Sequence, residues 1–392
     1  MLIIKLALRN IMHAGLRSWL NIFVLSFAFV LIVMLEGLYD GMSQQIKDAM
    51  IDSEIGGGQF WQKDYDPYDP FSYEKSHAPI PENLSNEIRK GNATAVLVVP
   101  TAIFPKGHIQ SALLKGISPD QKVLKLPSSS LKSEDTTEIP GLIGSRMAQS
   151  TGLQIGDDLS IRFKNLHGTF DARDIRIVQI MNTNVQSIDK DQIWVPLETL
   201  RSLYLAPDEA TIVTLKKGIS HVPAGNPGWI LRDHGFLLKD LNDYIKQKKA
   251  SATFMFILLL GMALLAVFDT QVLAIFRRRK EMGTLMALGM TRWNVISLFT
   301  LEGCMLGILA FIIGSIYGIP LLAYLATTGI SLPRMVGQVG ISLGSVLYPK
   351  YGLQLYFVTS IILFISVIIV SFLPTRRITR LKPTDALRGK MS

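Results

Sequence analysis

Cysteine and charged residues are both scarce in this sequence. Cys304 is the only cysteine among 392 residues, so no disulfide can form within the chain. Charged residues make up 18% of the chain, whereas roughly 25% is usual in soluble domains. This composition excludes a disulfide-stabilised secreted domain and argues against an ordinary soluble protein.

The sequence also lacks the motifs of several enzyme classes. The histidines are scattered, and neither a Gly-x-Ser-x-Gly nor a His-Glu-x-x-His motif occurs. Gly389-Lys390 lacks the rest of a Gly-x4-Gly-Lys-[Ser/Thr] phosphate loop. We therefore expect no catalytic residue, no metal site and no cofactor bound by this chain, which should not hydrolyse ATP by itself.

Apolar residues make up 48% of the chain and are concentrated in four runs, at 20–38, 253–276, 295–325 and 356–373. Each meets or nearly meets the roughly 20 residues that cross a hydrocarbon core roughly 30 Å thick. Residues 43–250 have ordinary globular composition instead. The predicted fold class is a membrane α-helical protein with four transmembrane helices and a large α/β (α+β) periplasmic domain inserted between helices 1 and 2.

The distribution of charge predicts the orientation of the chain. Residues 43–250 hold 24 Lys and Arg against 25 Asp and Glu, so the net charge of +9 lies outside that range. The basic residues cluster before the first run, directly after the second and after the fourth. Such clusters stay on the cytoplasmic side. We therefore expect both termini and residues 277–294 in the cytoplasm, and no nucleic-acid partner to explain the basic composition.

The N-terminus has the pattern of a helix that lies on the membrane surface. Lys5, Arg9, His13 and Arg17 recur every four residues and so share one helix face. The predicted segments are an interfacial helix at 1–19, transmembrane helices at 20–42, 251–276, 295–325 and 353–374, a periplasmic domain at 43–250, a coupling helix at 277–294, a periplasmic loop at 326–352 and a cytoplasmic tail at 375–392.

The periplasmic domain alternates between strand and helix patterns. Strands are predicted at 95–99 and 158–163 and from Ile175 and Ile193, with helices at 82–90, 144–151 and 198–204.

The segment between the second and third runs reads as a short helix over about 278–288. Gly289 is placed to end this helix, and Thr291 can cap the next one. The apolar residues of one helix face are Met282, Leu285 and Met286. The residues alone leave two interpretations open, a helix that anchors the second span and a docking element for a cytoplasmic partner.

Several short motifs are distributed along the whole chain. They are Leu6-Ala7-Leu8-Arg9-Asn10, Gly152-Leu153-Gln154-Ile155-Gly156-Asp157, Trp194-Val195-Pro196-Leu197-Glu198, Arg278-Arg279-Lys280-Glu281-Met282-Gly283 with Ala287-Leu288-Gly289, and the basic stretch from Pro374 to Arg388. In this order they resemble motifs of a family of ABC-transporter permeases that includes lipoprotein-releasing, macrolide-export and cell-division permeases. The motif that begins at Arg278 is similar to the family's coupling helix.

The resemblance implies a permease that pairs with a second copy or a paralogue. A cytoplasmic ABC ATPase dimer, which binds ATP and Mg, would grip the coupling helices. By this resemblance the coupling residues are Arg278, Arg279, Glu281, Gly283, Ala287, Leu288 and Gly289. The implied function is extraction of lipoproteins or another lipid-anchored substrate from the inner (cytoplasmic) membrane of a Gram-negative-type bacterium.

Two other functions stay open: a mechanotransmission or efflux permease of the macrolide-exporter type, and a signalling scaffold that controls cell-wall hydrolases. The chain has four apolar runs rather than ten and no ATPase before Met1, which favours the lipoprotein-releasing branch. The loop at 164–174 is short and has no proline, unlike the hook of the family's chaperone-recruiting subunit. The sequence therefore leaves open whether the periplasmic partner is a chaperone or an adaptor.

Residues in the spans give three further predictions. In lipoprotein-releasing permeases the first two spans wall a cavity for acyl chains, and the residues expected to do so here are Phe23, Phe27, Val30, Met34, Phe254, Met255 and Met262. The third span carries small residues at helical spacing, suited to packing within the chain or in a dimer: Gly303, Gly307, Gly314 and Gly318. Asp269 lies in the second span, where a carboxylate costs on the order of 3 kcal/mol, so it should pair or face a polar cavity.

Overall fold

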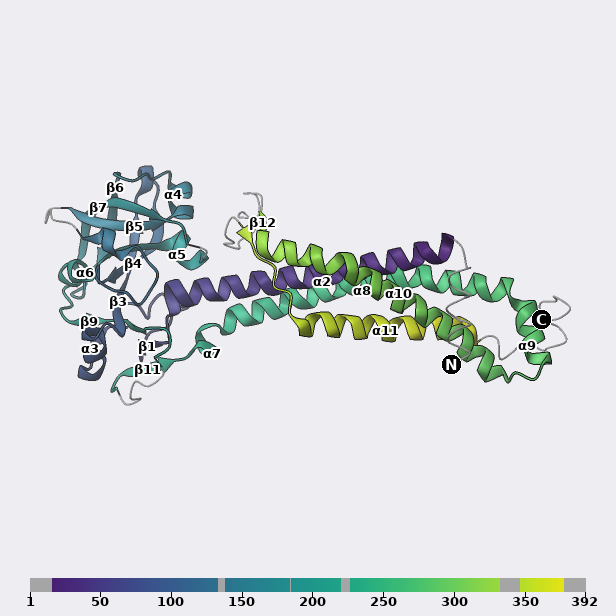
Figure 1. The fold of residues 1–392 in the computed structure, drawn as a ribbon. Coiled ribbons are helices and arrows are strands. Elements are labelled where there is room, and N and C mark those ends of the chain that lie inside the picture. The colour runs from purple at the N-terminus through teal and green to yellow at the C-terminus, as the bar shows by residue number, and fades with distance from the viewer. Residues whose placement is uncertain (1–15, 133–137, 184, 220–225, 332–345, 377–392) are drawn as a thin grey trace. The chain divides into compact units, whose positions relative to one another are not determined.

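The structure is a computed structural model that describes residues 16–132, 138–183, 185–219, 226–331 and 346–376 (Figure 1). The predicted interfacial helix before residue 16, most of the predicted loop at 326–352 and the tail after residue 376 lie outside the described residues. The chain forms two compact units. The first holds the chain up to Met42, Ile245–Ser331 and the chain from Val346, and the second holds Ser43–Tyr244.

The described residues of the first unit contain most of each of the four helices that are long and apolar enough to cross a membrane. They are α2 (Leu16–Met50), α8 (Lys239–Arg277), α10 (Arg292–Thr328) and α11 (Leu353–Thr375). The short helix α9 (Arg279–Ala287) lies between α8 and α10 in the chain. A small ribbon joins β12 (Ile330–Ser331) to β13 (Val346–Leu347). The four apolar runs of the sequence are thus helical, as predicted.

Helix α2 is the most enclosed of the four. Half of its apolar window is buried, against 22–33% in the other three helices. Phe29 of α2 is fully buried in a cluster that also contains Val267 of α8, Ala310 of α10 and Val367 of α11. The other three helices therefore all contribute side chains to the core around α2.

The second unit, which lies between α2 and α8 in the chain, is built on a nine-stranded sheet (Figure 1). Its strands are β1 (Gln59–Gln62), β3 (Ala93–Ile103), β4 (Gln110–Ile117), β5 (Ile139–Gly144), β6 (Asp158–Lys164), β7 (Phe170–Met181), β8 (Gln192–Pro196), β10 (Ile212–Leu215) and β11 (Trp229–Arg232). Their order is β11-β1-β10-β3-β4-β8-β5-β7-β6. Because the far end of β3 also pairs with β6, through Thr101 and Phe163, the strands from β3 to β6 in this order form a closed ring.

Short helices and one further strand pair complete the second unit. The helices are α3 (Glu82–Arg89), α4 (Ser145–Thr151), α5 (Gln186–Asp191), α6 (Leu197–Tyr204) and α7 (His234–Leu237), and the pair is β2 (Ala78–Pro79) with β9 (Glu209–Ala210). The strands and helices predicted from the sequence are confirmed within a few residues. The sequence did not predict β4, β5, the short strands β1, β2, β9, β10 and β11, or the helices α5 and α7.

Strand β3 separates two apolar clusters. Leu97 and Val99 point into one cluster, while Val96 and Val98 point into the other, as the twofold repeat of a strand requires. The second cluster includes Trp194 of β8, which is 1% exposed. Both sides of the central strand are thus covered, which explains why the sequence shows a continuous apolar run there.

A buried carboxylate joins α5 to the start of α4. Asp189 is 2% exposed, and it accepts hydrogen bonds from the Ser145 hydroxyl at 3.2 Å and from backbone N–H groups of the first turn of α4. A Cβ on Gly144 would overlap the backbone of Asp189, so glycine permits this close approach. Burial raises the pKa of the Asp189 carboxyl, although the bonds from Ser145 and Arg146 oppose the rise.

Replacing Asp189 with asparagine should change the pH dependence of stability. Because the folded pKa lies above the ordinary value of 3.8, the contribution of this carboxyl is present at low pH and is lost as the pH rises through the folded pKa. Between about pH 4 and pH 7 the thermal midpoint of the wild type should therefore fall relative to that of Asp189→Asn. Tryptophan fluorescence of the full chain measures both midpoints. Asp191→Asn, at an exposed position of the same helix, is the control. If the midpoint of the wild type rose relative to that of Asp189→Asn as the pH increased, the prediction would be wrong.

Candidate functional site

The helix α9 packs against the first turns of α10 through one apolar face. Met282 is fully buried against Val295, Ile296 and Phe299 of α10. Leu285 and Met286 are partly buried in the same cluster, so the predicted apolar face is confirmed. This contact fixes α9 to the end of a membrane-length helix.

An ion-pair network holds the start of α9. The Arg278 guanidinium donates to Glu281 at 2.7 Å and to Glu302 of α10 at 3.0 Å, and it lies 5.0 Å from the centre of the Phe299 ring. Burial opposes the charge of Arg278, but Glu281 and Glu302 together raise its pKa above the ordinary value. Arg278 therefore stays charged and ties α9 to α10.

The other end of α9 is a sharp, exposed turn. Gly289 has φ +97°, a conformation that favours glycine, and the Thr291 hydroxyl accepts from the backbone N–H of Asn294 at 3.3 Å. Both capping predictions are confirmed. Leu288 is 81% exposed and Trp293 is 67% exposed, so this turn presents two large apolar side chains on the surface of the chain.

The residues predicted for coupling divide between the two faces of α9. Glu281, Ala287, Leu288 and Gly289 are exposed, whereas Gly283 is buried next to Met282. Gly283 therefore does not belong to the exposed surface of this segment. The backbone of Arg279 begins the helix.

The four glycines of α10 lie at contacts within the chain. A Cβ on Gly303 would overlap the Ser371 hydroxyl of α11, and one on Gly307 would lie 3.2 Å from Val367. Further along the same helix, a Cβ on Gly314 would lie 3.2 Å from the Phe29 side chain of α2. A Cβ on Gly318 would lie 2.6 Å from the Val30 side chain of α2. These glycines therefore lie where helices of one chain approach one another.

The seven residues predicted to wall an acyl-chain cavity do not share one environment. Val30 is 5% exposed and Met34 is partly buried in the core of the first unit. The remaining five are exposed and line the outer surfaces of α2 and α8: Phe23, Phe27, Phe254, Met255 and Met262. These five are available to lipid, an acyl chain or a second protein.

Polar side chains in the spans were only partly anticipated from the sequence. Asn21 of α2 is 5% exposed and donates to the Thr270 hydroxyl of α8 at 2.6 Å, a contact that the sequence analysis missed. The signal that would have found it is a polar residue at the start of an apolar run. Asp269, the neighbour of Thr270, is exposed on α8, so its carboxylate faces away from the core of the unit.

Comparisons with known proteins connect this geometry to a family. Residues 253–383, which include α9, match the family described as FtsX-like permease C-terminal. The macrolide export ATP-binding/permease protein MacB of Bordetella avium (strain 197N) is 24% identical over 234 residues, 56% of this chain and 34% of that protein. The lipoprotein-releasing system transmembrane protein LolC of Xylella fastidiosa (strain 9a5c) is 21% identical over 313 residues, 71% of this chain and 73% of that protein.

Among solved structures, the extracellular domain of the noncanonic ABC-type transporter YknZ from Gram-positive bacteria is similar over 42% of this chain and 84% of that chain. Its TM-score is 0.27 at 11% identity.

Four membrane-length helices, with the short helix α9 between the second and the third, are the architecture of a multi-pass membrane protein. The match of residues 253–383 to the FtsX-like permease family, together with the MacB and LolC relatives, confirms the resemblance to ABC permeases of the lipoprotein-release and macrolide-export type. The chain spans about a third of the length of the MacB relative.

The packing of α10 gives a testable prediction. Gly303→Ala places a methyl group on Ser371 and within 2.8 Å of the Gln271 amide, and overpacking of this kind costs about 1–3 kcal/mol. We expect a lower thermal midpoint for the full chain in detergent. Gly261→Ala in α8, where a Cβ meets nothing within 4 Å, is the matched control. Equal midpoints for the two variants would show that α10 and α11 do not approach as described.

Proposed function

We propose that this chain is the membrane subunit of an ABC transporter that extracts lipoproteins or other lipid-anchored substrates from the inner membrane. In this proposal both termini and α9 face the cytoplasm, and the unit of Ser43–Tyr244 faces the periplasm. ATP and Mg are bound by a separate ATPase dimer, and a second permease copy or paralogue completes the transporter. A periplasmic chaperone or adaptor would receive the substrate.

The observation that carries the coupling role is the two-sided character of α9. Met282 and the Arg278–Glu302 pair fix one side to α10, and the turn at Leu288 is exposed on the other. A force applied to such an exposed turn is transmitted to α10 because the contact behind it is closely packed. Exposed apolar side chains next to exposed charges are also typical of a protein-binding surface.

The match to LolC supports a lipid-anchored substrate. It covers 71% of this chain and 73% of LolC, whereas the match to MacB covers only 34% of MacB. The exposed apolar side chains of α2 and α8 provide surface against which acyl chains can lie.

The second candidate function is a mechanotransmission or efflux permease of the macrolide-exporter type. The higher identity to MacB, 24% against 21%, favours it. In this case the periplasmic unit would act on a substrate outside the membrane, and no acyl chain would bind.

A single substitution on the exposed turn tests coupling. Leu288→Asp places a charge where a partner surface should cover Leu288, and a buried unpaired charge strongly weakens an interface. We expect loss of the ATPase from the complex purified from membranes, with an unchanged thermal midpoint of the permease. Ile109→Asp, at a site 74% exposed in the other unit, should retain the ATPase. If the Leu288→Asp permease co-purified with as much ATPase as the wild type, docking at this turn would be contradicted.

The substrate is tested by mass spectrometry of the complex purified gently from its own host. Acylated peptides or intact lipoproteins are expected to remain bound, and Phe27→Ala with Met262→Ala should reduce them because both remove exposed apolar surface. Phe357→Ala, at a position 60% exposed on α11, is the matched control. A complex that carries an adaptor or a cell-wall hydrolase and no acylated peptide would favour the macrolide-exporter or scaffold function instead.

A further inference from the structure

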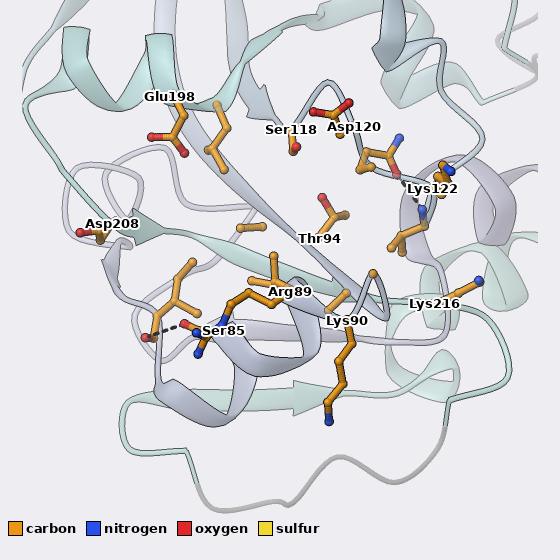
Figure 2. Close-up of a pocket in the computed structure, with 18 of the residues that line it drawn as sticks. Ser85, Arg89, Lys90, Thr94, Ser118, Asp120, Lys122, Glu198, Asp208 and Lys216 are labelled. Carbon is orange, nitrogen blue, oxygen red and sulfur yellow. Dashed lines mark hydrogen bonds between the residues drawn. The ribbon is translucent and has the colours of Figure 1, made fainter.

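The second unit has an open groove of about 1030 Å³ between α3, α6 and the first residues of β3 (Figure 2). Its labelled charged side chains are exposed and of both signs: Arg89, Lys90, Lys122 and Lys216 against Asp120, Glu198 and Asp208. Several already pair within the chain, as Glu198 does with Arg201 at 2.8 Å. A mixture of solvated charges favours no single class of ligand, so this groove does not specify one.

In the first unit, the chain between α10 and α11 crosses α2. Residues 348–351, called the strap here, follow β13 and lie on Gly37 and Gly41 of α2. These two glycines are one turn apart and so share a helix face. A Cβ on Gly41 would lie 2.3 Å from the Tyr348 carbonyl oxygen, and a Cβ on Gly37 would overlap the Tyr351 ring. The strap therefore contacts the backbone of α2 directly.

The strap is attached to three of the four long helices. The backbone N–H of Lys350 donates to the Gly37 carbonyl of α2 at 2.9 Å. On one side the strap follows β13, which pairs with β12 just beyond α10, and on the other side it continues into α11. At this level, called the strap end of the bundle, α2 is thus held to both α10 and α11.

Helix α8 has a much smaller contact at the strap end. Ala252 and Phe256 are buried there against Ile32 of α2, in a cluster separate from the main core of the unit. Most apolar neighbours along this half of α8 are between 55% and 73% exposed: Phe254, Met255, Ile257, Leu258 and Met262. A Cβ on Gly261 would meet nothing within 4 Å, unlike one on the glycines of α10. No close backbone approach therefore fixes this half of α8.

An ion pair joins α8 to α2 at the same level. The Lys249 ammonium lies 3.1 Å from the Asp40 carboxylate, and the two side chains are 51% and 40% exposed. Glu36, one turn before Asp40, also attracts Lys249, and it accepts a hydrogen bond from Thr359 of α11. Ion pairs as exposed as that of Asp40 and Lys249 stabilise weakly and are screened by salt.

The other half of α8 is held firmly. Val267 is fully buried in the main core, and Gln271 is 4% exposed. The Thr270 hydroxyl accepts from the Asn21 amide of α2 at 2.6 Å. Helix α8 is therefore fixed near α9 and loosely held at the strap end.

We infer that the strap-end half of α8 is a gate that separates from α2, with the Asp40–Lys249 pair as its latch. Segments with few buried apolar contacts open at a lower free energy than the rest of a fold. In a membrane, lipid tails replace the lost contacts of Ile32 and Phe256 at little cost, since lipid is as apolar as these side chains. The strap holds α2 in place while α8 moves. This inference goes beyond the proposed function and does not require it.

Distances between spin labels on the full chain in lipid nanodiscs measure the gate. Cys304→Ser removes the native cysteine, and labels are attached to exposed positions through Met255→Cys of α8 and Phe357→Cys of α11. We expect two distances for this gate pair. Replacing Met255→Cys by Phe27→Cys reports on α2, and replacing it by Leu273→Cys reports on the other half of α8. Each of these two reference pairs should give one narrow distance.

Neutralising the latch should open the gate. Asp40→Asn is expected to raise the fraction of the longer gate-pair distance by up to about fivefold, as for the loss of an exposed ion pair. Salt at 1 M should have the same effect on the labelled parent chain and no further effect on Asp40→Asn. Asp48→Asn is the matched control, because the Asp48 carboxylate accepts from Gln44 of its own helix at 3.1 Å. This variant should leave the distances unchanged.

Two results would overturn the inference. One is a single narrow distance for the gate pair that neither salt nor Asp40→Asn changes. The other is an equal broadening of the Phe27–Phe357 reference pair, which would mean that the whole bundle loosens. Gly41→Ala tests the strap separately, since its methyl group displaces the strap backbone and should broaden that reference pair. If it did not, the strap would not be what holds α2. These measurements use neither the ATPase nor a lipid-anchored substrate, so they are decided independently of the proposed function.

Discussion

The close approach of α10 to its neighbours is the contact on which the membrane unit depends. Between helices in lipid the hydrophobic effect is weak, so short-range packing and interhelical hydrogen bonds must hold the bundle. Along one helix, Gly303 and Gly307 face α11, while Gly314 and Gly318 face α2. The first turns of the same helix carry Phe299, against which α9 packs. The candidate coupling segment is therefore attached to the helix that also positions the rest of the bundle.

Local signals explain what the sequence could predict. The four apolar runs, the end of α9 at Gly289 and the cap at Thr291 each depend on residues within a few positions of one another. Strands β1, β10 and β11 were missed because each has only four residues and gains stability from distant partners, as when Gln59 pairs with Thr214. Closure of the ring through β3 and β6 is likewise a long-range pairing that no local pattern encodes.

In the candidate site, too, local features could be predicted from the sequence and contacts between distant residues could not. The period of α9 predicted its buried face correctly, but the pair of Arg278 with Glu302 joins two helices and could not be read from spacing. In the first span, Phe27 is exposed and Phe29 is fully buried, although both are phenylalanines in one apolar run. A helix that is apolar on all sides gives no pattern that separates a lipid-facing residue from a core residue. Predictions of individual cavity residues therefore needed the packing of the bundle.

Both units contain buried polar atoms without a hydrogen-bond partner among the described residues, such as the Tyr351 hydroxyl in the first unit and the Trp194 Nε1 in the second. In the first unit Asn21 has found a partner in Thr270, so its polarity contributes to the association of α2 with α8. In the second unit, Trp194 and Thr214 are buried without a described partner, although phenylalanine and valine would fill the same space. Glu54, in the π-helical turn that follows α2, and Asp240, in the first turn of α8, both line a cavity of this unit.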